Sequence, residues 1–411
     1  MTLSLTFATL AAALAAAPAP SSAAPAEPAA AAPREAPRLL GYDVRLRASA
    51  GFFDGVGVLA DSGPVAELEA DLTPELRRGR LRLTLPLRFD RVERLRASLD
   101  ETALGAAAEP EVRLTRALRA GAEAGLTWMD RPGWPDVYQR DAGGALAPTD
   151  RYGYLAWRVG VNAWLRAGAG QHLRARYRWV SYDYAGDPGF DPLDPGHLTP
   201  RDHGEHQVDL SWRLVREAWS AGARLDWTYR LDDVAPARAA GSGAIVDGKL
   251  QRLSTAEPSV EVELPRLGGR VALALSYGLG IQSDRYAGYY SYEEHHPRLR
   301  ATVPLSERLE AALELDGRFR RYGADSTGAT RLEWGDRRQS TRLGVGGGLR
   351  YALAHGLAVR ADAEWIDRST NFPDYVPNGV APDYDIDWDY RNVQVTAGLE
   401  WRASREAGRR R

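Results

Sequence analysis

Apolar and polar residues alternate with a period of two along most of the chain. In the segment HLRARYRWVSYDY, at 172–184, Arg174, Arg176 and Arg178 alternate with apolar and aromatic residues, and VALALSYGLGI at 271–281 repeats the pattern. Period-2 alternation puts successive side chains on opposite faces of a β-strand. Repeated along the chain, the pattern predicts about 16 strands, each with one apolar and one polar face.

The connections between these predicted strands alternate between short and long. The short ones are 73–79, 166–170, 216–218, 266–269 and 354–356. The long ones are 93–110, 130–151, 185–204, 232–248, 323–330 and 371–385. Outer-membrane barrels have tight periplasmic turns and longer external loops, and an even strand number leaves both chain ends in the periplasm.

A single alternating strand fits two architectures. A soluble antiparallel sheet packs its apolar face on a core and exposes its polar face to water. A membrane barrel turns the apolar face to lipid and the polar face to a wet interior. The sorted connections favour an all-β fold, a single transmembrane antiparallel up-and-down β-barrel of about 16 strands, within a range of roughly 14–18. A soluble exported all-β protein is the alternative.

Composition excludes several other classes of protein. The mean hydropathy of −0.40 and the lack of a long apolar run beyond the first residues argue against spanning helices. A net charge of −2 argues against a nucleic-acid partner. The absence of cysteine excludes disulfides, cysteine–zinc sites, thiol catalysis and covalent haem attachment, and we expect no cofactor. The 12 Trp and 18 Tyr against 7 Phe suit membrane–water interfaces.

The chain divides into four predicted segments. An apolar stretch from Leu3 to Ala17, followed by small residues, predicts a signal peptide at 1–26 and therefore export. An Ala/Pro-rich flexible leader follows at 27–41. The barrel is predicted at 42–402, and a basic C-terminal tail at 403–411.

The last predicted strand, VQVTAGLEW at 393–401, alternates and ends on an aromatic residue. It resembles the C-terminal signal that bacterial outer-membrane proteins present to the barrel assembly machinery, although a basic tail follows Trp401 here. Over 42–401 the chain resembles the class of outer-membrane β-barrels, porin-like in size, without matching a specific family. The resemblance implies localisation in a Gram-negative outer membrane. It also implies contact with lipid and lipopolysaccharide and recognition by the assembly machinery.

Strand parity places the charged residues in the barrel lumen, because an arginine facing lipid costs about 2–4 kcal/mol at mid-bilayer. Opposite charges on neighbouring strands are expected to pair, as between 45–47 and 67–69 or between 298–300 and 314–316. The candidate lumen-lining and selectivity residues are Arg45, Arg47, Arg82, Arg88, Arg158, Arg174, Arg176, Arg178, Arg213, Arg224, Glu67, Glu69, Glu314 and Asp316. In the third external loop, Asp136, Arg140 and Asp141 are candidates for a constriction.

No residue pattern predicts catalysis or a metal site. The motifs GxSxG and HExxH are absent, so we expect no enzyme activity. The acidic, histidine-containing segment 187–206 has no spacing typical of a calcium loop, and we assign no metal to it.

The sequence therefore predicts a porin-like channel for passive diffusion of small hydrophilic solutes through a charged lumen. The simpler interpretation of the same charges is that they form ion pairs in the barrel wall with a purely structural role. An alternative function is a barrel scaffold, a sheath or an export-assembly component. Such a barrel would house a periplasmic partner protein, for example a multihaem cytochrome or a secreted substrate.

Overall fold

The computed structural model describes residues 38–57, 61–94, 100–131, 134–140, 146–149, 153–184, 202–238, 245–268, 270–285, 290–325, 337–370 and 390–406. All of them belong to one compact unit, Pro37–Arg411. The predicted signal peptide and most of the predicted leader lie outside the described residues. Within these ranges, no helix is both long and apolar enough to cross a bilayer.

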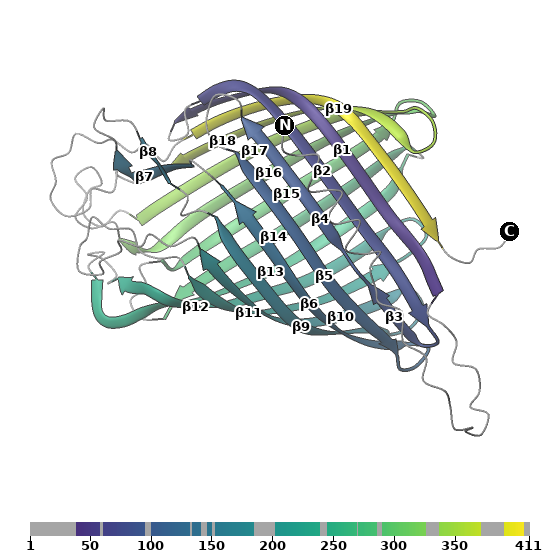
Figure 1. Ribbon diagram of the computed structural model, residues 1–411, viewed down its shortest axis with the longest axis horizontal. Helices are drawn as coiled ribbons and strands as arrows, with labels where there is room; N and C mark the ends of the chain where they lie inside the picture. Colours follow the sequence, from purple (N-terminus) through teal and green to yellow (C-terminus); the bar gives the residue numbers. More distant parts are fainter. Residues whose placement is uncertain are drawn as a thin grey trace, which may run out of the picture. The chain divides into compact units, whose positions relative to one another are not determined.

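The described elements are all β-strands (Figure 1). Their bounds are β1 Arg38–Gly57, β2 Asp61–Arg78, β3 Leu81–Thr84, β4 Leu87–Arg94, β5 Glu101–Arg113, β6 Leu118–Asp130, β7 Trp134–Arg140, β8 Leu146–Thr149, β9 Tyr154–Arg166, β10 Gln171–Tyr184, β11 His203–Val215, β12 Ser220–Arg238, β13 Ile245–Leu267, β14 Val271–Asp284, β15 Tyr292–Pro304, β16 Leu309–Asp325, β17 Arg337–Ala352, β18 Leu357–Thr370 and β19 Tyr390–Glu406.

Seventeen of the strands form one antiparallel sheet that closes on itself where β1 pairs with β19. The strands β3 and β4 together occupy one strand position between β2 and β5, so the barrel wall has sixteen strand positions. They are separate because Pro86 has no N–H to donate to the ladder, although its carbonyl still accepts from Ala107 at 2.9 Å. The predicted up-and-down barrel of about 16 strands is confirmed.

The two ends of the barrel differ in how the strands are linked. At one end, called the short-turn end here, the links are 79–80, 114–117, 167–170, 216–219, 268–270, 305–308 and 353–356. At the other, the long-loop end, they include 131–153, 185–202, 326–336 and 371–389. The predicted sorting of connections by length is therefore present, with 58–60 as a short link at the long-loop end.

Two of the predicted long loops are wrong in extent. Residues 101–110 lie in β5, and most of 232–248 lies in β12 and β13. In β5 the outward positions include Ala106, whose methyl group gives only a weak apolar signal. The outer parts of β12 and β13 extend beyond the stretch in which one face must be apolar, so alternation does not mark them.

The terminal strands extend past the predicted barrel limits of 42 and 402. β1 begins at Arg38 and β19 ends at Glu406. The two strands pair with each other over this extension, with Gly41 opposite Glu406 and Tyr42 opposite Arg405. Pairing satisfies backbone groups that an isolated leader or tail would leave to water.

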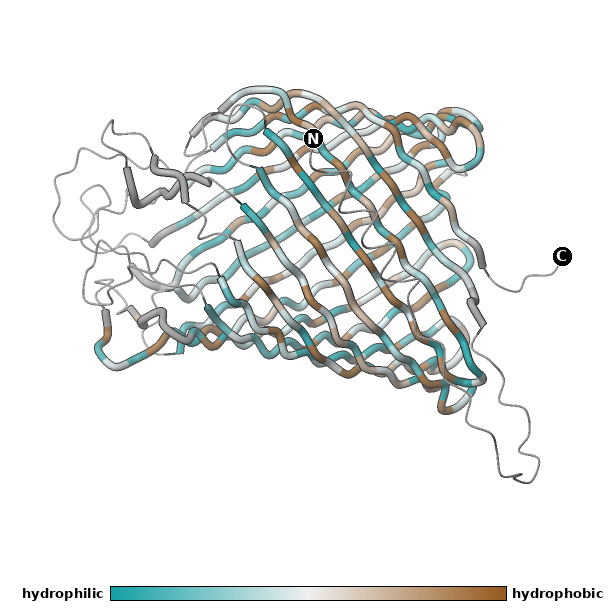
Figure 2. The backbone as a smooth tube through the Cα atoms, in the orientation of Figure 1, coloured by the Kyte–Doolittle hydropathy of each residue, from teal (hydrophilic) through white to brown (hydrophobic). Residues whose placement is uncertain are grey.

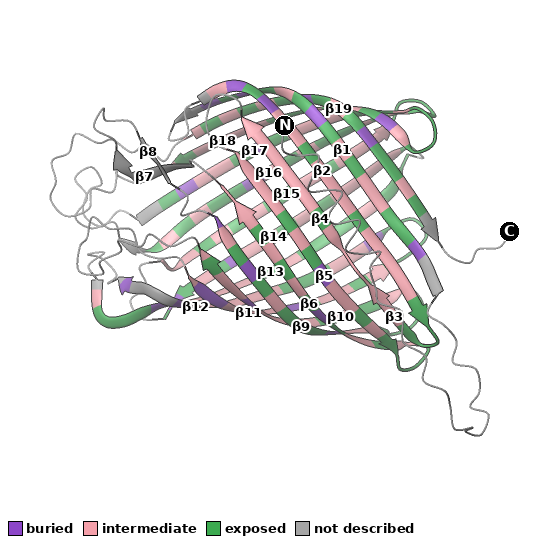
Figure 3. Cartoon of the chain, viewed as in Figure 1, coloured by how far each residue is buried: buried purple, intermediate pink, exposed green. Residues whose placement is uncertain are grey.

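The strands of the barrel show two chemically different faces over most of their described length. Hydrophobic and hydrophilic residues alternate along the strands in Figure 2, and exposed residues alternate with less exposed ones in Figure 3. One face carries large apolar side chains that remain accessible, including Val161 at 58%, Val260 at 56% and Leu126 at 55% exposure. No dry hydrophobic core of a soluble protein is formed by the described residues, since large apolar side chains are mostly on this accessible face.

Candidate functional site

The charged face of the wall is its concave, inner face. Side chains on it contact each other across an intervening strand: Arg47 on β1 donates to Asp362 on β18 at 3.0 Å, and Gln394 on β19 donates to Glu67 on β2 at 2.5 Å. Side chains converge on the inside of a curved sheet and diverge on its outside. These strand-skipping contacts therefore place the ionic face in the lumen.

At the closing seam, Glu400 on β19 gathers arginines from four strands. Its side chain is 0% exposed and accepts from Arg350 at 2.8 Å and from Arg402 at 3.1 Å. Arg360 and Arg45 lie 3.7 and 3.8 Å from the same carboxylate. A fully buried carboxylate requires such partners, because burial without them costs far more than it contributes.

Next to this hub, the predicted pairs between β1 and β2 are present. Arg45 lies 3.3 Å from Glu69, and Arg47 lies 3.9 Å from Glu67. Ser49 adds a hydrogen bond of 2.9 Å to Glu67. The wall between β19 and β2 is thus held by opposite charges on neighbouring strands.

On β15 to β17, the acidic residues pair differently from one another. Arg298 and Arg300 donate to the two oxygens of Glu314 at 2.8 and 3.1 Å. Asp316, predicted as a partner of the same arginines, instead contacts His296 at 2.5 Å and Arg342 at 2.7 Å. Asp316 lies directly opposite Arg298 in the ladder. Its carboxylate nevertheless contacts His296 and Arg342, which occupy the next inward positions of β15 and β17.

A lumen cavity of ≈ 610 Å³ lies over this part of the wall. Its floor includes Gly344, Gly346 and Gly348, three successive inward positions of β17 that carry no side chain. At Gly348 a Cβ would come within 2.6 Å of the Asp362 carboxylate, whereas at Gly346 the nearest side-chain atom would be 3.8 Å away. The glycines therefore make a recess in the inner wall.

Between β6 and β12, two nearly buried carboxylates contact two of the three arginines quoted first from the sequence, Arg176 and Arg178. Glu123 lies 4.0 Å from Arg176 and 3.7 Å from Arg178, and Asp209 lies 3.4 Å from Arg176. Arg224 bridges Asp209 at 2.7 Å and Asp226 at 2.6 Å, although these two carboxylates face each other across the ladder.

The remaining predicted lumen residues also lie on the inner face. Arg82 pairs with Glu75, Arg213 pairs with Glu263, and Arg88 lies 3.1 Å from Asp90. Arg174 lies over the Trp164 ring, with 5.5 Å from its guanidinium carbon to the ring centroid. Arg158 lines a small cavity of ≈ 270 Å³ toward the long-loop end.

The set of lumen residues predicted from the sequence omits three carboxylates that form ion pairs on the inner wall. Glu123, Asp362 and Glu400 anchor the ion pairs, yet they were not among the candidates. Strand parity is a sufficient signal for Asp362 and Glu400, since each lies on the polar face of a predicted strand. Glu123 lies in the Ala/Gly-rich stretch 120–125, whose alternation is too weak to predict a strand. Their burial was not readable from sequence, because it depends on which arginines the closed ladder brings around them.

The predicted constriction loop contains its own small sheet. β7 and β8 pair with each other, with Asp136 opposite Ala147 and Arg140 opposite Leu146, and Asp141 lies outside the described residues. The inward folding of this loop therefore stays a prediction. Among the residues that the structure describes, no group of three or more His, Asp or Glu side chains could hold a metal ion.

The outer face is apolar and bordered by aromatic residues. Trp128 and Trp157 lie near the long-loop end of their strands, while Trp219, Tyr351 and Trp401 lie near the short-turn end, all between 36% and 42% exposed. Two such girdles mark the interfaces of a membrane barrel.

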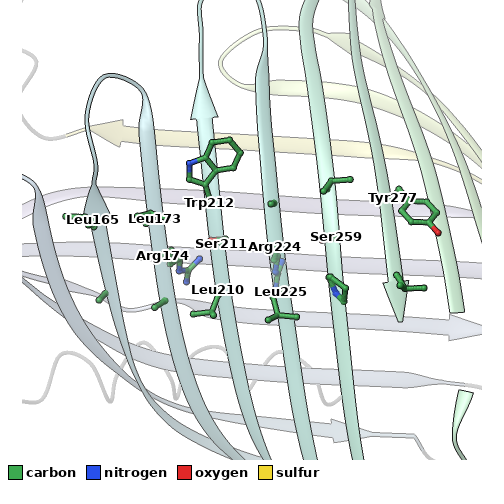
Figure 4. Close-up of a pocket in the computed structure, with 16 residues that line it drawn as sticks. Leu165, Leu173, Arg174, Leu210, Ser211, Trp212, Arg224, Leu225, Ser259 and Tyr277 are labelled. Atoms are coloured by element: carbon green, nitrogen blue, oxygen red, sulfur yellow. The ribbon is translucent and has the colours of Figure 1, made fainter. Parts of the chain in front are cut away.

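Between the girdles, a shallow apolar groove of ≈ 750 Å³ runs over β9 to β14. Figure 4 shows its side chains on neighbouring strands, with Leu210 beside Leu225, its cross-strand partner. This surface suits acyl chains rather than water.

Only helices and closed barrels satisfy their backbone inside a bilayer, and this barrel is closed, apolar outside and ionic inside. The protein is therefore a transmembrane β-barrel of the bacterial outer-membrane class. No family model matches the chain, and no curated protein does.

Several solved structures of outer-membrane proteins are similar to it. A loop L8 deletion mutant of OmpT, an outer membrane protein of Vibrio cholerae, is 12% identical with a TM-score of 0.47, over 89% of this chain and 100% of that one. OccAB4 of Acinetobacter baumannii is 10% identical with a TM-score of 0.45, over 89% and 98% of the two chains. OccK2 (OpdF) of Pseudomonas aeruginosa, solved in complex with glucuronate, is 14% identical with a TM-score of 0.39, over 88% and 97%.

Proposed function

We propose that the protein is a porin-like channel through which small hydrophilic solutes diffuse passively. The observation that carries the proposal is the ionic inner wall of a closed barrel with sixteen strand positions. Barrels of about 16–18 strands leave an aqueous channel, whereas smaller ones fill their interior with side chains.

The inner ion pairs remain accessible to water. The side chains of Arg300 and Arg213 are 55% and 53% exposed, although Arg300 pairs with Glu314 on the neighbouring strand and Arg213 with Glu263 two strands away. Because these side chains on the concave face are exposed, other described side chains do not cover the inner wall there. A solute crossing the barrel would meet alternating cationic and anionic groups, which screen by charge and size.

Single-channel recording in planar lipid bilayers tests the proposal. The purified folded protein, added to a bilayer in KCl, is expected to produce discrete current steps whose size grows with salt concentration. Protein from the same preparation unfolded by boiling is the matched control and should give none. Folded protein that inserts without any current above the leak would contradict the channel.

A further inference from the structure

A second lumen cavity, of ≈ 650 Å³, lies at the short-turn end and is unusually cationic. It is formed by β3, β5, β6, β9, β10 and β11 with the turn between β5 and β6. Its lining contains seven arginines and one histidine but only two glutamates. The whole chain, by contrast, has 53 basic and 55 acidic residues. The cluster is therefore a local excess of positive charge.

The strand register places several of these basic side chains directly opposite one another. Arg113 on β5 faces Arg119 on β6. His172 on β10 faces Arg166 on one side and Arg213 on the other. Like charges directly opposite on one face of a ladder destabilise it. Arginines also face each other elsewhere in the wall, as Arg350 and Arg360 do, but there both lie within 3.7 Å of Glu400.

Several of the cations also lack a compensating partner within the described part of the chain. Arg113, Arg116 and Arg166 make no ion pair there, whereas Arg119 lies 3.3 Å from Glu111. The Nε atoms of Arg82 and Arg174 are buried without a hydrogen-bond acceptor among the described residues. Arg113, Arg116 and Arg166 are exposed, so their guanidinium groups can accept an anionic partner from the lumen.

In the cavity over β15 to β18, by contrast, most of the arginines are paired with carboxylates. There Arg298, Arg300 and Arg342 all contact a carboxylate within 3.1 Å. Both cavities lie on the inner wall and have similar volumes. Five carboxylates line the cavity over β15 to β18, and Arg318 is the one arginine of its lining without an ion pair to a described residue. At the short-turn end two carboxylates line the cavity, and Arg113, Arg116, Arg166 and Arg174 have no such ion pair. The excess of unpaired positive charge is therefore greater in the short-turn cavity.

We propose that this cluster, the short-turn cation cluster, binds a small dissolved solute with two or more anionic oxygens, such as a phosphate or a dicarboxylate. The proposal rests on the proposed channel function, since the solute reaches the cluster through the lumen. Guanidinium groups present paired N–H donors that match the oxygens of such groups. The cluster would select and retain anions at the short-turn mouth.

The test is the effect of inorganic phosphate on single-channel current. Added from the short-turn side in KCl, phosphate is expected to reduce the wild-type current in a saturable manner. The double variant Arg113→Gln/Arg166→Gln should need about tenfold more phosphate, because two charge-assisted contacts are lost. Arg318→Gln is the matched control: it also removes an inner-wall arginine without an ion pair to described residues, and it should behave as wild type. Folding of each variant is checked by heat-modifiable migration on gels.

The outcomes separate the two proposals. Equal phosphate sensitivity in wild type and double variant would overturn the cation cluster while leaving the channel intact. If no variant conducts, calorimetric titration of folded protein in detergent with phosphate decides the cluster alone. Binding by wild type that weakens in the double variant supports the cluster, and absence of binding overturns it. Loss of the phosphate effect when phosphatidylglycerol is added to the bilayer would mean that a lipid headgroup is the occupant, contrary to the proposal.

Discussion

At the scale of single residues, the wall depends on a few carboxylates that each hold several arginines. Glu400 is the clearest case, since its buried oxygens contact arginines from β1, β17, β18 and β19. Its position on the last strand, beside the closing pair with β1, makes it part of the seam. The seam is the pairing of the last strand with the first, which closes the barrel. The ion pairs there therefore stabilise the closed form.

Substituting Glu400→Gln is expected to destabilise the barrel by on the order of 3 kcal/mol, because breaking a buried ion pair leaves uncompensated charge. The measurement is urea unfolding of the protein in detergent micelles, followed by tryptophan fluorescence. Glu364→Gln, on the inner face of β18 but exposed and without an ion pair to described residues, is the control and should change the midpoint little. Equal midpoints for the two variants would contradict the seam role of Glu400.

Strand parity predicted which residues share a face, but not which of them touch. The contacts of Arg45 and Arg47 with Glu69 and Glu67 follow from a hairpin and could be named in advance. The contact of Arg47 with Asp362 joins strands far apart in the chain and arises only on closure. Arg113 and Arg119 face each other across the β5–β6 hairpin, but the cavity that also brings Arg82, Arg166 and Arg213 to them forms only when the strands assemble.

At the scale of one strand, sidedness is the property that defines the fold. β14 shows it in adjacent positions: Leu275 and Tyr277 are 45% and 44% exposed on the outer face. Ser276, between them, faces Glu261 on β13 and Arg298 on β15, both charged. A one-residue shift would move every apolar group of the strand to the wrong face.

Two arginine substitutions on β14 test this sidedness. Leu275→Arg should cost about 2–4 kcal/mol, since it puts a charge against hydrocarbon near mid-bilayer. Ser276→Arg, one position along, should be tolerated because it faces the lumen and a carboxylate on β13. Folding yield and unfolding midpoint in lipid vesicles are the readouts. Comparable losses at both positions would argue against opposite environments for the two faces.

Alternation identified most strands because lipid demands a continuous apolar stripe on one face. It failed where that demand is weak. The outward positions of β5 are partly alanine, and the sequences of the outer parts of β12 and β13 lack regular apolar–polar alternation, so the pattern predicts loops in both regions. Pro86 divides one strand position into β3 and β4. The alternating leucines on both sides of Pro86 conceal this break in the sequence pattern.

At the scale of the whole molecule, nearly balanced charge is distributed unevenly over the lumen. Most inner arginines are matched by carboxylates, which keeps the wall stable without filling it. The short-turn cation cluster departs furthest from this pattern among the described residues, since Arg113, Arg116, Arg166 and Arg174 have no ion pair there. As the proposed channel, the barrel is expected to favour anions at its short-turn end.

The central claim is that the apolar face of each strand meets lipid and the ionic face meets water inside the barrel. The chain has no cysteine, so single substitutions report each position without background. The most direct measurement is labelling of Leu275→Cys, Ser276→Cys, Val395→Cys and Gln394→Cys in lipid vesicles with a charged, membrane-impermeant thiol reagent. We predict reaction at positions 276 and 394 and protection at 275 and 395. Protection at 276 and 394 together with reaction at 275 and 395 would contradict the account.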